Sequence, residues 1–197
     1  MLTHLDEESY KALIEARIFE PKSLQTALSN RSRRSLAGKD GRLLILAADH
    51  TARGKLTANS DPLAMADRFI MLDRIVRALA DSEVDGVLAS ADILEELSWL
   101  GVLEGRLAIG TMNRGGVIGA KWELDDRMTA YDAEHIAKYG LDGGKMLLRI
   151  DDSDSRVART IESVATAVTQ LADHGIMCLL EPLPYARNSD GVAVLDE

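Results

Sequence analysis

The sequence has little cysteine, few aromatic residues and no long apolar run. The single cysteine, Cys178, excludes an internal disulfide framework and is typical of a reduced, cytoplasmic protein. No apolar run approaches the roughly 20 residues that a membrane helix needs. The N-terminal residues also lack the basic and apolar regions of a signal peptide. We therefore expect a cytoplasmic protein that has no membrane partner.

Basic charge is scarce as well. The chain has 23 Lys and Arg against 32 Asp and Glu, which gives a formal net charge of −9. A broad nucleic-acid-binding surface requires a basic face, so no nucleic acid is expected as a partner. A small anionic ligand stays possible, because a few arginines are enough to hold one phosphate or carboxylate.

Apolar residues are plentiful, and their distribution divides the chain in two. With 197 residues, of which 46% are hydrophobic, the chain is long enough to bury a substantial core. Helical patterns cover residues 6–18 and 21–28, and a basic, turn-forming stretch follows them. We predict an N-terminal helical extension over residues 1–41 and a β/α domain over residues 42–197.

From residue 43 onward, short apolar strands alternate with amphipathic helices. Strands are predicted at 43–48, 84–89, 107–111, 145–150 and 176–180, and helices at 61–79, 93–100, 132–139 and 155–174. This alternation is typical of βαβ units and a parallel sheet. Neither a G-x-G-x-x-G turn nor a phosphate-binding P-loop motif is present. We therefore predict an α/β fold of the TIM-type (β/α) barrel class.

The length does not fit a complete barrel. Eight βα units take about 250 residues, whereas the fifth predicted strand here already extends to about residue 181. We expect only about five units. The chain is then either the N-terminal part of a longer barrel or a five-stranded form that must associate to cover its edges, so a homo-oligomer is expected.

Side-chain alternation along the strands predicts a charged interior. Ligands of β/α folds bind at the carboxyl ends of the strands. Alternation places Asp49, Lys145, Arg149, Asp151 and Glu181 on the inner faces of their strands. Because charged groups are rarely buried unless they are paired or functional, the cluster is either an active site or a structural ion-pair network.

A lysine beside carboxylates favours amine chemistry. Desolvation and neighbouring cations lower the pKa of a lysine, while nearby carboxylates raise it. A carboxylate near a reacting carbonyl can also take and return protons while a carbon–carbon bond breaks. The pattern therefore indicates aldol chemistry through a Schiff base.

Three segments resemble a known family of enzymes. They are Ala48-Asp49-His50, Gly144-Lys145-Met146-Leu147-Leu148-Arg149 and Leu180-Glu181-Pro182-Leu183. They resemble the class I, Schiff-base aldolases, which include archaeal-type fructose-bisphosphate aldolase and tagatose-bisphosphate aldolase. The resemblance implies that a carbon–carbon bond is cleaved or formed through a lysine imine, without a metal or other cofactor.

The resemblance also implies roles for the three catalytic candidates. Asp49 is the acid that handles substrate hydroxyls and protons, Lys145 is an assisting lysine, and Glu181 is the acid/base group. The imine-forming lysine of such aldolases usually lies on a sixth strand, which is not among the strands predicted here. Lys145 is therefore either the assisting lysine or the imine-forming one.

Substrate binding is predicted for a second group of residues near the strand ends. The candidates are His50, Arg53, Arg114, Arg149 and Asp151. Arg53 and Arg114 are either phosphate contacts or members of plain loops. The four histidines show no metal-binding spacing, so no metal site is predicted.

The expected substrate is a small sugar phosphate or keto acid. Two alternatives to the aldolase stay open. One is another acid/base barrel enzyme, such as an isomerase that uses Asp49 and Glu181. The other is a catalytically incomplete barrel fragment.

Overall fold

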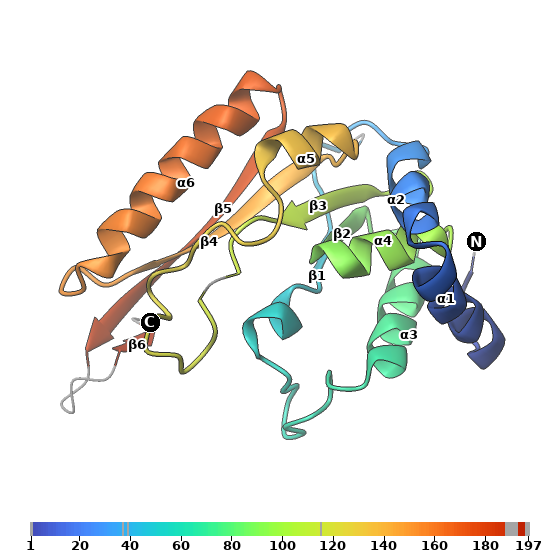
Figure 1. The fold of residues 1–197 in the computed structure, drawn as a ribbon, viewed down its shortest axis with the longest axis horizontal. Coiled ribbons are helices and arrows are strands. Elements are labelled where there is room, and N and C mark those ends of the chain that lie inside the picture. The colour runs from blue at the N-terminus through green and yellow to red at the C-terminus, as the bar shows by residue number, and fades with distance from the viewer. Residues whose placement is uncertain (1, 37, 39, 115, 188–192, 196–197) are drawn as a thin grey trace.

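The protein has an α/β fold built on a curved, mainly parallel sheet (Figure 1). The structure is a computed structural model that describes residues 2–36, 38, 40–114, 116–187 and 193–195. Five parallel strands pair in sequence order, β1-β2-β3-β4-β5, and a short sixth strand pairs antiparallel with β5. The strands are β1 (Ile45–Ala47), β2 (Gly86–Ala89), β3 (Leu107–Thr111), β4 (Gly143–Ile150), β5 (Met177–Arg187) and β6 (Ala193–Leu195).

The helices cover the outer face of the sheet. Strand residues that alternate with the charged positions, such as Met146 and Leu148 on β4, belong to the same buried core as Val164 and Leu171 of α6. This amphipathic division leaves the other face of the sheet for polar groups. The helices are α1 (Glu7–Phe19), α2 (Pro21–Asn30), α3 (Arg68–Leu79), α4 (Ala91–Trp99), α5 (Ala133–Lys138) and α6 (Arg156–Asp173), with a 3-10 turn, η1 (His50–Arg53), after β1.

The prediction of a TIM-type barrel is wrong. Among the described residues the parallel sheet has five strands, and it forms a half-barrel in which β1 and β5 do not pair with each other. Closure requires enough strands, tilted at a consistent angle, to bring the last strand back to the first. Here the edge of β5 pairs near its end with the antiparallel β6 instead.

The predicted order of strands and helices is confirmed, with differences at their ends. The two largest differences are at β5, which extends to Arg187 instead of residue 180, and at α3, which begins at Arg68 instead of residue 61. The Asp67 carboxylate accepts a hydrogen bond from the Ile70 amide and caps the helix. Upstream, the Asp61 carboxylate accepts a hydrogen bond from the Leu63 amide, and this local hydrogen bond favours a turn over a helix.

The N-terminal helices share the core of the sheet domain. Leu13 of α1 and Leu24 and Leu28 of α2 are fully buried in the main apolar cluster, and α2 packs against α4. Arg31, just after α2, forms a buried ion pair with Asp142 at the start of β4. Residues 2–36 are thus joined to the β/α region by both apolar packing and charge.

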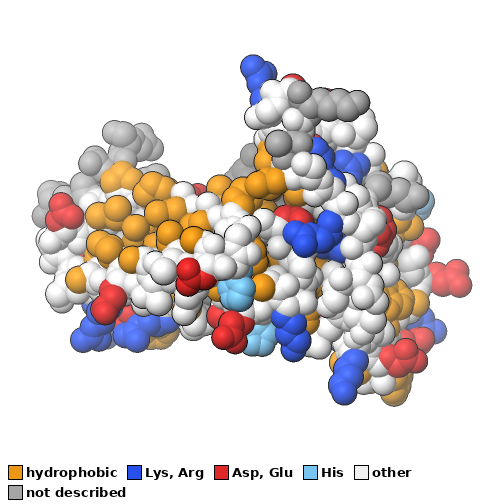
Figure 2. All heavy atoms as spheres, turned by 90° about the horizontal axis from the view of Figure 1, so that it is seen from above, with side chains coloured by type: hydrophobic (Ala, Val, Ile, Leu, Met, Phe, Trp, Pro, Cys, Tyr) orange, Lys and Arg blue, Asp and Glu red, His pale blue; other side chains and the backbone are white. Residues whose placement is uncertain are grey.

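Apolar side chains are exposed on the α6 side of the molecule, as Figure 2 shows. Ile161 and Val168 of α6 are 45% and 37% exposed, and Leu180 of β5 is 41% exposed. Contiguous apolar surface of this kind is typical of protein contacts. Within the described residues, no helix combines the length and apolar character that crossing a bilayer requires.

The β2–β3 pairing depends on the absence of a side chain at Gly86. A Cβ atom there would lie 2.3 Å from the carbonyl oxygen of Leu107, so the backbone would have to move. We expect Gly86→Ala to lower the free energy of unfolding by about 1–3 kcal/mol, the usual cost of overpacking. Urea denaturation measures this change in the free energy of unfolding. Thr169→Ala, on the exposed face of α6, is the control. Equal midpoints for the two variants would contradict the prediction.

Candidate active site

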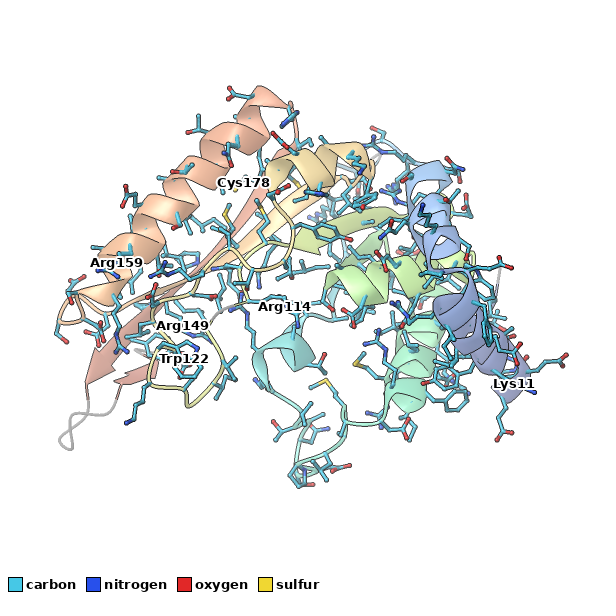
Figure 3. All side chains as sticks on the ribbon, in the orientation of Figure 1. Lys11, Arg114, Trp122, Arg149, Arg159 and Cys178 are labelled. Atoms are coloured by element: carbon cyan, nitrogen blue, oxygen red, sulfur yellow. The ribbon has the colours of Figure 1, made fainter. Side chains whose placement is uncertain are left out.

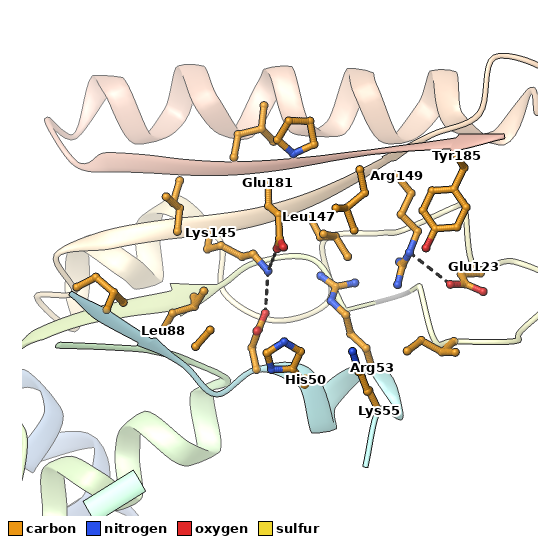
Figure 4. A pocket seen from close by; sticks show the side chains of 18 residues that line it. His50, Arg53, Lys55, Leu88, Glu123, Lys145, Leu147, Arg149, Glu181 and Tyr185 are labelled. Carbon is orange, nitrogen blue, oxygen red and sulfur yellow. Dashed lines mark hydrogen bonds and ion pairs between the residues drawn. The ribbon is translucent and has the colours of Figure 1, made fainter. Parts of the chain in front are cut away.

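A cavity of about 730 Å³ lies on the concave face of the half-barrel. Its walls come from β1, η1, β4, β5 and the loop of residues 116–126, as the close view in Figure 4 shows. Asp49, Lys145 and Glu181 meet within it, although they come from three different strands or strand ends. The structure therefore brings together all three residues that the sequence singles out as catalytic candidates.

Lys145 is held between two carboxylates. Its Nζ atom lies 3.0 Å from Asp49 Oδ2 and 2.7 Å from Glu181 Oε2 (Figure 4). Lys145 and Asp49 are buried, whereas the Glu181 side chain is 49% exposed. The ammonium group is thus closed off on the Asp49 side and open to the cavity on the Glu181 side. Among the described residues, Lys145 is the one buried lysine.

Strand register explains how these groups meet. Lys145 pairs with Thr111 of β3 and Leu179 of β5, and its carbonyl accepts a hydrogen bond from the Met112 amide. Asp49 follows β1 directly, where the chain turns into η1. Alternation along β4 then directs Lys145 and Arg149 to the concave side, as predicted.

The electrostatics of Asp49 favour its ionised form. Burial raises the pKa of this carboxyl, but the Lys145 ammonium and hydrogen bonds from Lys145 and Thr111 outweigh burial, so its pKa lies below the usual value. The Thr111 hydroxyl donates to Asp49 Oδ2 over 3.1 Å. Asp49 is therefore a carboxylate at neutral pH.

This lowered pKa predicts how stability depends on pH. A carboxyl whose pKa is lower in the folded state stabilises the protein above its unfolded-state pKa, about 3.9, and loses that effect as the pH falls through its folded-state pKa. We expect Asp49→Asn to lower the free energy of unfolding at pH 7 and to flatten its acid dependence. Urea denaturation from pH 7 to pH 2 measures both effects. Asp152→Asn, at an exposed site, is the control; a wild-type acid slope in Asp49→Asn would contradict the prediction.

A second charged cluster lies beside the lysine. Arg53 Nη1 is 2.5 Å from Asp126 Oδ2, and Arg53 Nη2 donates to Asn113 Oδ1 over 3.1 Å. Arg149 Nε lies 3.3 Å from Glu123 Oε1, and Arg149 Nη1 lies 3.5 Å from Asp126 Oδ2. Arg53, Glu123 and Arg149 thus line the cavity, and Asp126 contacts both arginines from outside the lining.

The predicted substrate-binding residues fall into two sets. His50, Arg53 and Arg149 line the cavity. Asp151 accepts hydrogen bonds from the Ser153 amide and hydroxyl, and so shapes the turn between β4 and α6. The Arg114 amide donates hydrogen bonds to the Thr129 hydroxyl and to the Arg127 carbonyl oxygen. Figure 3 shows Arg114 lying apart from Arg149. Asp151 and Arg114 are not among the residues that line this cavity.

Some residues that line the cavity or contact its lining are missing from the sequence prediction. Thr111 faces Asp49, and the alternation argument would have found it if applied to β3, since Thr111 is the register partner of Lys145. Glu123 and Asp126 lie in an irregular loop, where periodicity gives no signal. Tyr185 lies on the part of β5 that extends beyond the predicted strand.

Two further features concern ligands and reactive groups. Within the described part of the chain, no cluster of three or more His, Cys, Asp or Glu side chains is arranged to hold a metal ion. Burial raises the pKa of the Cys178 thiol, which lies between β5 and α6 (Figure 3). Cys178 is therefore a packing residue and a poor nucleophile.

The fold and the cavity define an α/β protein with a candidate active site on the concave face of a parallel half-barrel sheet. The chain belongs to the Cgl0159-like family, whose family model matches residues 41–197. It is similar to Cgl0159 from Corynebacterium glutamicum (Brevibacterium flavum), known from a crystal structure, with 40% sequence identity and a TM-score of 0.94. The match covers 98% of this chain and 65% of that one, so this chain spans 65% of the length of Cgl0159. No curated protein matches the chain.

Proposed function

We propose that the protein is a class I aldolase-like lyase, which cleaves or forms a carbon–carbon bond through a Schiff base on Lys145. The observation that supports this most directly is the buried Lys145 Nζ atom, held between Asp49 and Glu181 at a cavity wall. A buried lysine with adjacent acid/base groups has the components that imine chemistry requires. The two carboxylates are also placed to stabilise the positive charge of the iminium intermediate that forms on Lys145.

The proton balance assigns a role to each carboxylate. Glu181, which is half exposed, takes a proton from the Lys145 ammonium, and the free amine attacks the substrate carbonyl. The carbinolamine then loses water, for which Glu181 returns the proton. The product is an iminium cation in the former position of the ammonium group. Asp49 stays ionised beside it and stabilises its positive charge.

The remaining cavity residues fit a small polar substrate. His50 and Arg53 stand next to Asp49 on η1, and Arg149 lies further along β4. We propose a sugar phosphate or a keto acid as the substrate. A cytoplasmic location and a homo-oligomeric state are also part of the proposal, supported by the single cysteine and by the exposed apolar side chains on α6 and β5.

Borohydride trapping tests the imine. The protein is incubated with dihydroxyacetone phosphate or with pyruvate as probes, reduced with sodium borohydride, digested and analysed by mass spectrometry. The proposal expects a stable adduct on the peptide that contains Lys145, and no adduct without the probe. A carbon–carbon lyase turnover that proceeds with no reducible adduct would overturn the imine mechanism.

The position of Lys145 between Asp49 and Glu181 also supports a second candidate, an isomerase-type acid/base enzyme. In that case Lys145 keeps its proton and polarises a substrate carbonyl, while Asp49 and Glu181 move protons between neighbouring carbons. This candidate expects interconversion of sugar phosphate isomers without an adduct. If neither adduct nor turnover is found with these probes, the remaining alternative is that this chain is catalytically incomplete by itself.

A further inference from the structure

The Arg149 guanidinium is buried in the cavity wall with unusually long contacts. Arg149 is 4% exposed, and its contacts to Glu123, Gly116 and Asp126 measure 3.3, 3.3 and 3.5 Å. Its Nε atom has no hydrogen bond of normal geometry among the described residues. A buried guanidinium normally forms short, often bidentate bonds to carboxylates. The contacts of Arg149 are therefore long, and its Nε–H group lacks a hydrogen bond of normal geometry within the described part of the chain.

Arg53 provides a comparison within the same cluster. Its exposure is similar and its Nε atom also has no hydrogen bond among the described residues, yet its Nη1 atom lies 2.5 Å from Asp126 Oδ2 and its Nη2 atom bonds Asn113 Oδ1. Asp126 is also tied to the Gly116 amide and to Thr160, so its position is fixed. The two arginines therefore differ in their terminal nitrogens: those of Arg53 have close polar partners, whereas the contacts of Arg149 Nη1 are 3.3 and 3.5 Å long.

The acid next to Arg149 Nε comes from an exposed loop. Glu123 Oε1 faces Arg149, and Glu123 Oε2 accepts a hydrogen bond from the Gly119 amide of its own loop. The loop keeps several apolar side chains out of the core: Val117, Ile118 and Trp122 are 39%, 50% and 57% exposed. The loop is anchored by the buried Leu124 and Asp126, whereas residues 117–122 have little buried apolar surface, so a rearrangement at Glu123 that is confined to this stretch has a low cost.

We infer that Glu123 is an internal counter-ion that occupies an anion-binding subsite at Arg149, and that an anionic group of the substrate displaces it. The ligand group is a phosphate monoester or a carboxylate, both of which form bidentate bonds with a guanidinium. While Glu123 is in place, Arg53 and Arg149 face two carboxylates. When it moves away, they share Asp126 alone, and Lys55 of the cavity lining adds a further positive charge.

The position of this subsite restricts the substrate, and this step rests on the proposed lysine chemistry. Lys145 and Arg149 are four residues apart on one face of β4, so their Cα atoms are separated by about 13 Å along the strand. A substrate whose carbonyl reaches Lys145 and whose anion binds Arg149 carries these groups at opposite ends of a carbon chain. A sugar phosphate, in which several bonds separate the carbonyl from the phosphate, fits this arrangement better than a 2-oxo acid, in which the carbonyl and the carboxylate are adjacent.

Calorimetric titration with inorganic phosphate, in a low-chloride buffer, tests the subsite without depending on turnover. We expect Glu123→Gln to bind phosphate about tenfold more tightly than the wild type, because one internal competitor is removed. Arg149→Met is expected to lose binding. Glu83→Gln removes the same charge at a distant exposed site and is the matched control; it is expected to bind like the wild type.

The outcomes separate this inference from the lysine mechanism. If Glu123→Gln binds phosphate no more tightly than the wild type, or if Glu83→Gln tightens binding equally, the counter-ion role is overturned. Lys145→Met is expected to keep phosphate binding, since Arg149 and Glu123 are unchanged. Failure of imine trapping with intact phosphate binding would therefore reject the proposed reaction and leave the anion subsite standing.

Discussion

Lys145→Met is expected to abolish the borohydride-trapped adduct and to lower carbon–carbon lyase turnover by about a thousandfold or more, the scale seen when a covalent nucleophile is removed. The reason is that the methionine side chain has similar length but no amine. Lys145 is also the one buried lysine among the described residues, so no equivalent amine is positioned beside Asp49 and Glu181. Steady-state kinetics and mass spectrometry of the reduced protein measure the two effects.

The control is Lys11→Met, which removes an exposed lysine on α1, far from the cavity in Figure 3. It is expected to leave adduct and turnover unchanged. Because Lys145→Met leaves two carboxylates facing each other, its folding has to be verified by circular dichroism. A folded Lys145→Met protein that still forms the adduct elsewhere would assign Lys145 the assisting role.

The part of the site that lies on strands was predictable from the sequence. Alternation of apolar and charged residues assigned Asp49, Lys145 and Arg149 to the inner face, where all three line the cavity. These assignments hold because a shift of the β4 register by one residue would move Met146 and Leu148 out of the core that they share with α6. Burial therefore determines which side of each strand faces the cavity.

Loop geometry and sheet closure were not predictable in the same way. Glu123 lines the cavity and Asp126 contacts Arg53 and Arg149, and both lie in an irregular segment whose path depends on individual hydrogen bonds, such as that from the Gly116 amide to Asp126. The start of α3 likewise depends on capping by Asp67, which competes with turn-forming bonds upstream. Local strand and helix patterns also do not determine whether a sheet closes, because closure depends on the number and tilt of strands together.

Asp142 is where the largest loss of stability is expected from a single substitution outside the cavity. Its carboxylate accepts hydrogen bonds from Arg31 Nη2 over 2.7 Å, from Arg33 Nε over 3.0 Å and from the Ala108 amide over 2.9 Å. The Arg31 side chain is 1% exposed, so Asp142→Ala leaves a buried guanidinium without its counter-ion. We expect the free energy of unfolding to fall by about 3–5 kcal/mol.

Urea denaturation at pH 7 measures this loss, and Arg33→Ala is the matched control. The Arg33 side chain is 53% exposed and bonds the other oxygen of the same carboxylate, so its loss is expected to cost less than about 1 kcal/mol. Equal effects of the two variants would mean that burial of Arg31 carries no penalty. Asp142 joins the chain after α2 to β3 and to the start of β4. If Asp142→Ala alone has a large effect, and if it unfolds in one cooperative transition, α1 and α2 unfold together with the sheet.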